Sequence, residues 1–276
     1  MMDPASSSAL RRGAALIELM ISTAITVLTG SIIFTILNTG MILFAKNTAI
    51  NMAHQQARIA VLQMEQDLHS CVSIPQLVDG NKNVVTGNVP AAGISFQLYA
   101  KGPLKVASTA NAGQNQINIR VSGYTPVVGQ RLCIPTHQIE LDITGVGAGS
   151  TDRILTLSED LPVDVKTMLY DPAVNQEIAV NVVCFITDRL YYVVSGGALR
   201  YFGPKQPAEG RILANDITTP TPFSIPLTPA GAQYNRFVAA INLSTADSRS
   251  SNRGFKAANM FLNAMVPYRA RLCITQ

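Results

Sequence analysis

The chain carries near its start the stretch Arg11-Arg12-Gly13-Ala14-Ala15-Leu16-Ile17-Glu18-Leu19-Met20. Two arginines and a glycine precede an apolar run, and one carboxylate follows the glycine by five residues. The next 27 residues, Leu19 to Ala45, include no charged side chain. As a helix rising about 1.5 Å per residue they span roughly 40 Å, more than the bilayer's hydrocarbon core of about 30 Å. The sequence therefore predicts a membrane-spanning helix.

Glu18 lies at the edge of the apolar span, where a carboxylate needs a cationic partner. An unpaired carboxylate at the edge of such a span costs on the order of a few kcal/mol. A plain anchor gains nothing from this charge, so we expect Glu18 to pair with a cation. Arg11 and Arg12 place the amino terminus in the cytoplasm by the positive-inside rule. Everything after Lys46 is then expected outside the cytoplasm.

The stretch resembles the leader of type IV prepilins and type II secretion pseudopilins. Leu16-Ile17-Glu18-Leu19 matches the apolar-apolar-Glu-Leu core of that family. The resemblance implies that a prepilin peptidase cuts between Gly13 and Ala14, which makes Glu18 the fifth mature residue. It also makes Ala14 the candidate for N-methylation, although the family most often has Phe or Met there. Glu18 would then pair with the new amine of Ala14 and drive filament assembly.

Beyond the span the pattern stays helical to about Val72. Between Lys46 and Cys71 there is no Gly or Pro, and an apolar stripe recurs at helical spacing through Ala57, Val61, Met64, Leu68 and Cys71. We divide the chain into a leader (1–13), a spanning or filament-core half of the helix (14–45), the half outside the membrane (46–72) and a globular β-rich domain (73–276). Residues 104–162, rich in glycine and short strands, are expected to form an inserted β-rich lobe.

Period-two alternation replaces the helical pattern after Pro75. It predicts strands at 94–98, 117–121 and 139–143, and a hairpin at 191–202 with Gly196-Gly197 in its turn. Residues 237–241 and 260–262 are expected to form another strand pair. The expected fold is α+β: a long amino-terminal helix against an antiparallel sheet, as in pilins.

The order of hairpin, strand, polar loop and final strand is similar to the W-type minor pilins and J-type pseudopilins, which lie near a filament tip. The resemblance implies a structural subunit of a type IV pilus or a secretion pseudopilus. Its partners would be prepilin peptidase, other minor pilins or pseudopilins through helix packing, and the inner membrane. The alternative is a membrane-anchored extracytoplasmic enzyme or binding protein whose amino terminus mimics the signal.

The four cysteines, Cys71, Cys133, Cys184 and Cys273, all fall in the expected periplasmic part, where disulfides persist. Their spacings fit no zinc or haem motif. We expect at least one disulfide, with three connectivities open if two form; free buried thiols are the alternative.

No catalytic constellation or cofactor motif is present. The three histidines show no metal-ligand spacing, and Cys133 with His137 is a poor nucleophile pair because Pro135 argues against the helix that would align them. The carboxylates Asp160, Asp164, Asp171 and Glu177 do not follow the EF-hand pattern, so we favour solvated loop residues over a calcium site. A net charge of +4 with 14% charged residues, and the thin basic loop Arg249–Lys256, leads us to expect no nucleic-acid partner. No small-molecule substrate is expected either.

Overall fold

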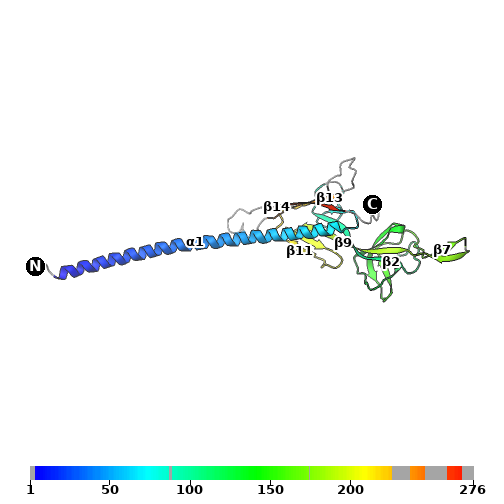
Figure 1. The fold of residues 1–276 in the computed structure, drawn as a ribbon, viewed down its shortest axis with the longest axis horizontal. Coiled ribbons are helices and arrows are strands. Elements are labelled where there is room, and N and C mark those ends of the chain that lie inside the picture. Colours follow the sequence, from blue (N-terminus) through cyan, green and yellow to red (C-terminus); the bar gives the residue numbers. More distant parts are fainter. Residues whose placement is uncertain (1–3, 87–88, 174, 226–236, 246–259, 269–276) are drawn as a thin grey trace.

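The computed structural model describes residues 4–86, 89–173, 175–225, 237–245 and 260–268. One long helix, α1 (Pro4–His69), precedes a series of β-strands. In Figure 1 this helix forms a rod, and the strands gather around and beyond its carboxyl-terminal end. The chain therefore has the expected α+β class, with a long apolar helix followed by antiparallel sheet.

The ends of α1 differ from the expected ones. The helix begins at Pro4, ten residues before Ala14, and proline suits a first helical turn because its missing N–H has no intrahelical partner there. It ends at His69, three residues before Val72. The backbone N–H of Val72 instead donates to the carbonyl of Gln97 at 2.9 Å. The chain thus leaves the helix by joining a neighbouring strand.

The strands confirm each period-two prediction. Gly196 and Gly197 form the expected hairpin turn with φ of 59° and 73°. The strands are β1 (Gln76–Val78), β2 (Gly93–Val106), β3 (Gln116–Arg120), β4 (Gln130–Ile134), β5 (Ile139–Val146), β6 (Asp152–Leu157), β7 (Met168–Asp171), β8 (Gln176–Ala179), β9 (Val183–Ser195), β10 (Ala198–Phe202), β11 (Arg211–Ala214), β12 (Phe223–Ser224), β13 (Phe237–Thr245) and β14 (Met260–Tyr268). A short 3-10 helix, η1 (Pro135–His137), follows β4.

Nine strands form one antiparallel sheet in the order β1-β2-β3-β6-β5-β4-β9-β10-β11, with an additional β2–β9 pairing. That pairing closes the ring β2-β3-β6-β5-β4-β9 on itself. We call this closed ring the barrel lobe. Residues 104–162, the expected insertion, supply β3 to β6 and the end of β2, and β9 completes the ring from Val183 onward. The separate β7–β8 hairpin lies between them in the chain.

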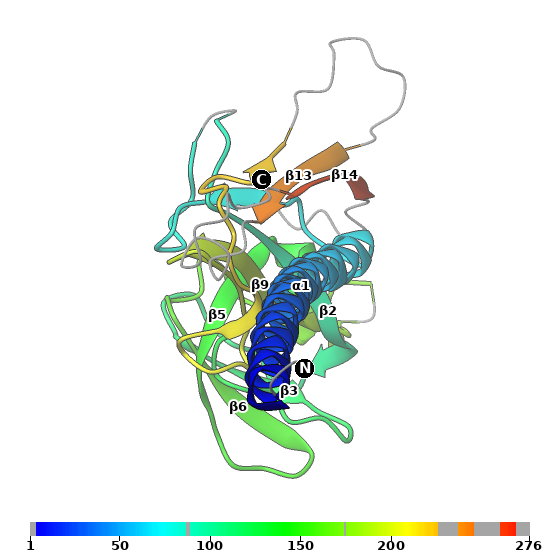
Figure 2. The same cartoon turned by 90° about the vertical axis from the view of Figure 1, so that its left-hand side faces the viewer.

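The other half of the domain packs on α1. It uses β1, β10, β11, the first half of β2, the second half of β9, and a small sheet β12-β13-β14. Isolated bridges Ala91–Phe223 and Ile217–Thr245 join the small sheet region to the rest. Figure 2, which looks along the rod from its amino-terminal end, shows β13 and β14 to one side of α1 and β9 behind it. We call this half the helix-packed sheet.

Each half has its own core of alternate strand residues. The first contains Ala60, Val61, Met64, Leu68, Cys71, Ile94, Phe96, Leu190, Tyr192, Leu199, Ala239 and Ile241. The second fills the barrel lobe with Leu104, Ile117, Ile119, Leu132, Ile134, Ile139, Ile143, Leu155, Leu157, Cys184 and Ile186. The barrel lobe lies beyond the carboxyl-terminal end of α1 along the axis of the rod (Figure 1).

Candidate functional site: the amino-terminal half of the long helix

The first half of α1 extends away from the domain (Figure 1). Its apolar side chains are exposed. From Leu16 to Phe44 its large hydrophobic side chains, apart from the partly buried Ile42, are 50% to 74% exposed, on every side of the helix. A helix that is apolar all round is suited to lipid or to neighbouring helices, not to water. Among the described residues, α1 is the one helix long and apolar enough to cross a membrane.

Several hydroxyl groups within this half donate to carbonyl groups of the helix itself. Thr26, Thr29 and Thr35 each donate to the carbonyl four residues earlier at 2.7–2.8 Å. Thr23 bonds the carbonyls of Leu19 and Met20 in the same way. A hydroxyl without a partner is costly in hydrocarbon. These hydrogen bonds therefore let the segment carry threonines and still be compatible with lipid.

Glu18 lies exposed on this half, five residues after Gly13. The backbone is helical through Gly13 and Ala14, so the Gly13–Ala14 bond lies inside α1. Residues four apart lie on the same face of a helix, which places Glu18 one turn from Ala14. Glycine weakens a helix interior by about 1 kcal/mol relative to alanine, so the peptide bond after Gly13 lies at a soft point of the helix.

The second half of α1 is held by the domain. The five residues of the expected stripe, Ala57, Val61, Met64, Leu68 and Cys71, are all buried. Asp67 lies beside the stripe and accepts a hydrogen bond from the buried hydroxyl of Tyr192 in β9. Burial raises the pKa of the Asp67 carboxyl, an effect that the tyrosine hydrogen bond partly offsets.

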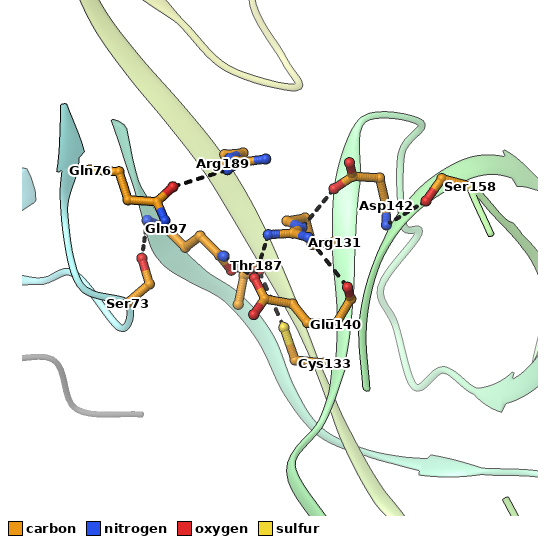
Figure 3. A network of polar contacts seen from close by, with 10 residues as sticks. All are labelled: Ser73, Gln76, Gln97, Arg131, Cys133, Glu140, Asp142, Ser158, Thr187 and Arg189. Carbon is orange, nitrogen blue, oxygen red and sulfur yellow. Dashed lines mark hydrogen bonds and ion pairs between the residues drawn. The ribbon is translucent and has the colours of Figure 1, made fainter. Parts of the chain in front are cut away.

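A polar network connects the end of α1 to the barrel lobe (Figure 3). Arg131 forms ion pairs with Glu140 and Asp142; its Nε lies 2.7 Å from Asp142 Oδ1, off the hydrogen-bond direction. Gln97 donates to Glu140 and accepts from the Thr187 hydroxyl at 2.7 Å. The backbone N–H of Gln97 also donates to Ser73, just after α1, at 2.9 Å. These bonds fix the orientation of the barrel lobe relative to the helix.

No disulfide joins the three described cysteines, Cys71, Cys133 and Cys184, which are all buried. Cys133 is paired with Phe185 across β4 and β9. Because successive side chains alternate between faces, Cys133 and Cys184 point to opposite faces of the ring. Cys71 belongs to the other core. The expected bridge is therefore not made among these three, and Cys273 lies outside the described residues.

The thiols are also unsuited to nucleophilic chemistry. Burial raises the pKa of Cys133 to about 11 and that of Cys184 to about 12, so both remain protonated at neutral pH. The Cys133 sulfur contacts Thr187 Oγ1 at 3.6 Å, whereas the His137 ring bonds Thr136 at 2.9 Å.

The carboxylates weighed as calcium ligands do not form a metal-binding group among the described residues. Asp164 accepts a hydrogen bond from the Ala112 backbone and lies 3.6 Å from Lys166. Asp171 accepts from the Ala173 backbone at 2.8 Å. These are local turn and surface contacts. The basic loop Arg249–Lys256 lies outside the described residues.

Sequence reasoning did not identify an open groove of about 420 Å³ between the barrel lobe and the helix-packed sheet. Lys82, Arg189, Tyr191 and Phe202 line its sheet side. Alternation along β9 places Arg189 and Tyr191 on the face opposite Leu190 and Tyr192. This alternation is visible in the sequence and could have shown that Arg189 and Tyr191 share one face. Lys82 comes from the loop after β1, and only the folded chain brings it to this face.

Comparison of the chain with protein-family models, with curated proteins and with solved structures finds no match.

Proposed function

We propose that this chain is a structural subunit of the prepilin-like class, a minor pilin or pseudopilin that prepilin peptidase processes between Gly13 and Ala14. The observation that carries the proposal is Glu18, a carboxylate five residues after a helical glycine, at the start of an exposed helix with no other charge until Lys46. A helix of this kind is stored in the inner membrane before assembly and becomes part of a filament core afterwards.

The chemistry of assembly follows from two charges. Cleavage after Gly13 creates an ammonium group at Ala14, next to a span that offers it no other ionic partner. An unpaired ammonium or carboxylate within lipid is costly, and pairing Glu18 with the amine of its own chain or of a neighbour removes both costs. A matched pair also fixes the axial register of packed helices, because any sliding separates the charges.

The apolar side chains of the amino-terminal half supply the contact surface. Helix association in lipid depends on van der Waals packing and on polar pairs, since lipid tails are as apolar as leucine. Small residues such as Gly30 and Gly40, which have open space around them, allow close approach of a second helix.

The barrel lobe favours a position at the filament tip. In a filament of parallel helices, the next subunit outward would occupy the region beyond the carboxyl-terminal end of α1. The barrel lobe already lies in that direction (Figure 1). A subunit with this shape fits the end of a pilus or a secretion pseudopilus better than a repeating position within it.

The proposal is tested by Glu18→Ala in a cell that assembles the filament. We expect the variant to stay folded and membrane-bound, because its span becomes more apolar, but to be recovered with sheared filaments or partner pilins at a small fraction of the wild-type level. Glu65→Ala is the matched control: it removes a partly exposed carboxylate of the same helix, whose described ion pair is a 3.9 Å contact with His69. Equal recovery of Glu18→Ala and wild type would refute the assembly role and favour a membrane-anchored enzyme or binding protein.

A further inference from the structure

The groove between the two halves of the domain carries positive charge that no carboxylate neutralises. Within the described part of the chain, neither Lys82 nor Arg189 forms an ion pair with an acidic side chain. The one acidic residue in the groove lining, Asp142, is already paired with Arg131. The groove therefore has an excess of cations over available anions.

Aromatic rings hold these two cations in place. The Lys82 ammonium lies 3.9 Å from the centre of the Phe202 ring and 5.9 Å from that of Tyr191. The Arg189 guanidinium lies 5.7 Å from the same Tyr191 ring. A cation over an aromatic face is attracted by the ring quadrupole, so both charges are positioned while their remaining donors are available.

Lys82 reaches the groove from a turn with an unusual backbone conformation. Lys82 has φ of 70°, in the left-handed region that a lysine seldom adopts. The turn around it is fixed by Asp79, whose side chain accepts from the backbone N–H groups of Asn81 and Asn83 at 2.8 Å each. Such conformations persist where the surrounding structure holds them, and they gather at ligand sites.

We infer that this groove binds the carboxylate of an acidic saccharide, with Lys82 and Arg189 holding the anionic group. Its volume of about 420 Å³ falls in the usual range of small-ligand sites, about 300–1,000 Å³. Pro204 and Pro207 offer apolar surface to the C–H face of a sugar ring, and Gln206, Thr144 and Asp142 offer polar groups to its hydroxyls. Lys82 already covers the Phe202 ring, which leaves no open platform there for a stacked nucleobase.

This inference goes beyond the proposed function and does not depend on it. Isothermal titration of the full chain in detergent micelles with trigalacturonate should give binding. The affinity for a neutral galactose trisaccharide should be lower by about tenfold or more. Lys82→Gln and Arg189→Gln should each lower the affinity for trigalacturonate about tenfold or more, because a charge-assisted contact is lost. Lys205→Gln, which removes one exposed cation from the nearby β10–β11 loop, should bind as wild type does.

The charge-preserving variants Lys82→Arg and Arg189→Lys separate recognition from folding, since both should retain most of the affinity. Three results would overturn the inference: no binding of trigalacturonate, equal affinity in wild type and the two glutamine variants, or equally tight binding of tetraglutamate. The last would assign the groove to an acidic peptide, because ring recognition would then contribute nothing.

Discussion

Asp67 and Tyr192 form the polar contact through which the helix is joined to the sheet. The Tyr192 side chain is fully buried, with its ring 5.1 Å from that of Tyr201 in β10 and 5.9 Å from that of Phe96 in β2. Its hydroxyl donates to Asp67, and burial with this carboxylate nearby raises the pKa of Tyr192. The Tyr192 ring contributes apolar packing. Its hydroxyl supplies a hydrogen-bond donor to the half-buried carboxylate of Asp67.

Removal of that hydroxyl should therefore weaken the fold. We expect Tyr192→Phe to lower the free energy of unfolding by about 1–3 kcal/mol, the cost of leaving a buried acceptor without its partner. Tyr191→Phe is the control, because Tyr191 lies on the opposite face and its hydroxyl bonds to none of the residues that the structure describes. A change within about 0.5 kcal/mol is expected. Denaturant unfolding of both variants by circular dichroism makes the comparison, and equal losses would contradict this role.

The raised pKa of Asp67 also predicts how stability depends on pH. The folded state holds the Asp67 proton more tightly than the unfolded state does, since burial disfavours the charged form. The stabilisation from this group is fully present below the usual pKa of 3.8 and is lost as the pH rises through the higher folded value. Asp67→Asn keeps an acceptor for Tyr192 and cannot ionise.

We therefore expect the unfolding free energy of Asp67→Asn to rise relative to wild type as the pH is raised from about 4 to about 7. Denaturant unfolding at several pH values measures this difference. A constant difference across the range would show that Asp67 does not titrate differently in the folded chain.

At the scale of elements, the parts with local signals could be predicted from the sequence. The apolar stripe of α1 and the alternation in the 191–202 hairpin depend on residues within a few positions of one another, and the structure has both. The barrel lobe could not be predicted in the same way. Its closure depends on β2–β9 contacts such as Thr187 to Gln97, which are 90 positions apart. The opposite orientation of Cys133 and Cys184 likewise follows from the register of β4 against β9. The number and spacing of the cysteines do not reveal that register.

The close packing of the neighbouring strands β1, β2 and β9 depends on one glycine. A Cβ atom added at Gly93 would lie 2.8 Å from the Tyr192 carbonyl and from side-chain carbons of Val78 and Val193. We expect Gly93→Ala to lower the free energy of unfolding by about 1–3 kcal/mol, as overpacking does. Gly80→Ala, at a position with open space around it, should change it by less than about 0.5 kcal/mol. Equal stability of the two variants in denaturant unfolding would contradict the close approach.

At the scale of the whole molecule, three parts follow one another along a single axis: the apolar half of α1, the helix-packed sheet and the barrel lobe (Figure 1). Strands β2 and β9 run through both halves of the domain, and the Arg131–Glu140–Gln97 network joins them at the boundary. In the proposed function, the apolar half of the helix anchors the chain and assembles with partner helices, and the barrel lobe at the far end contacts the surroundings.

Processing of the amino terminus is the sharpest test of the proposal that the chain is a prepilin-like subunit. The full chain is co-expressed with a prepilin peptidase, and its mass and amino-terminal sequence are determined. Processing as proposed removes the first 13 residues and leaves a chain that begins at Ala14. Gly13→Val should remain uncut, because a branched side chain then stands at the bond that the protease must approach. A wild-type chain that still begins at Met1, or that begins after Ala45, would refute the proposal.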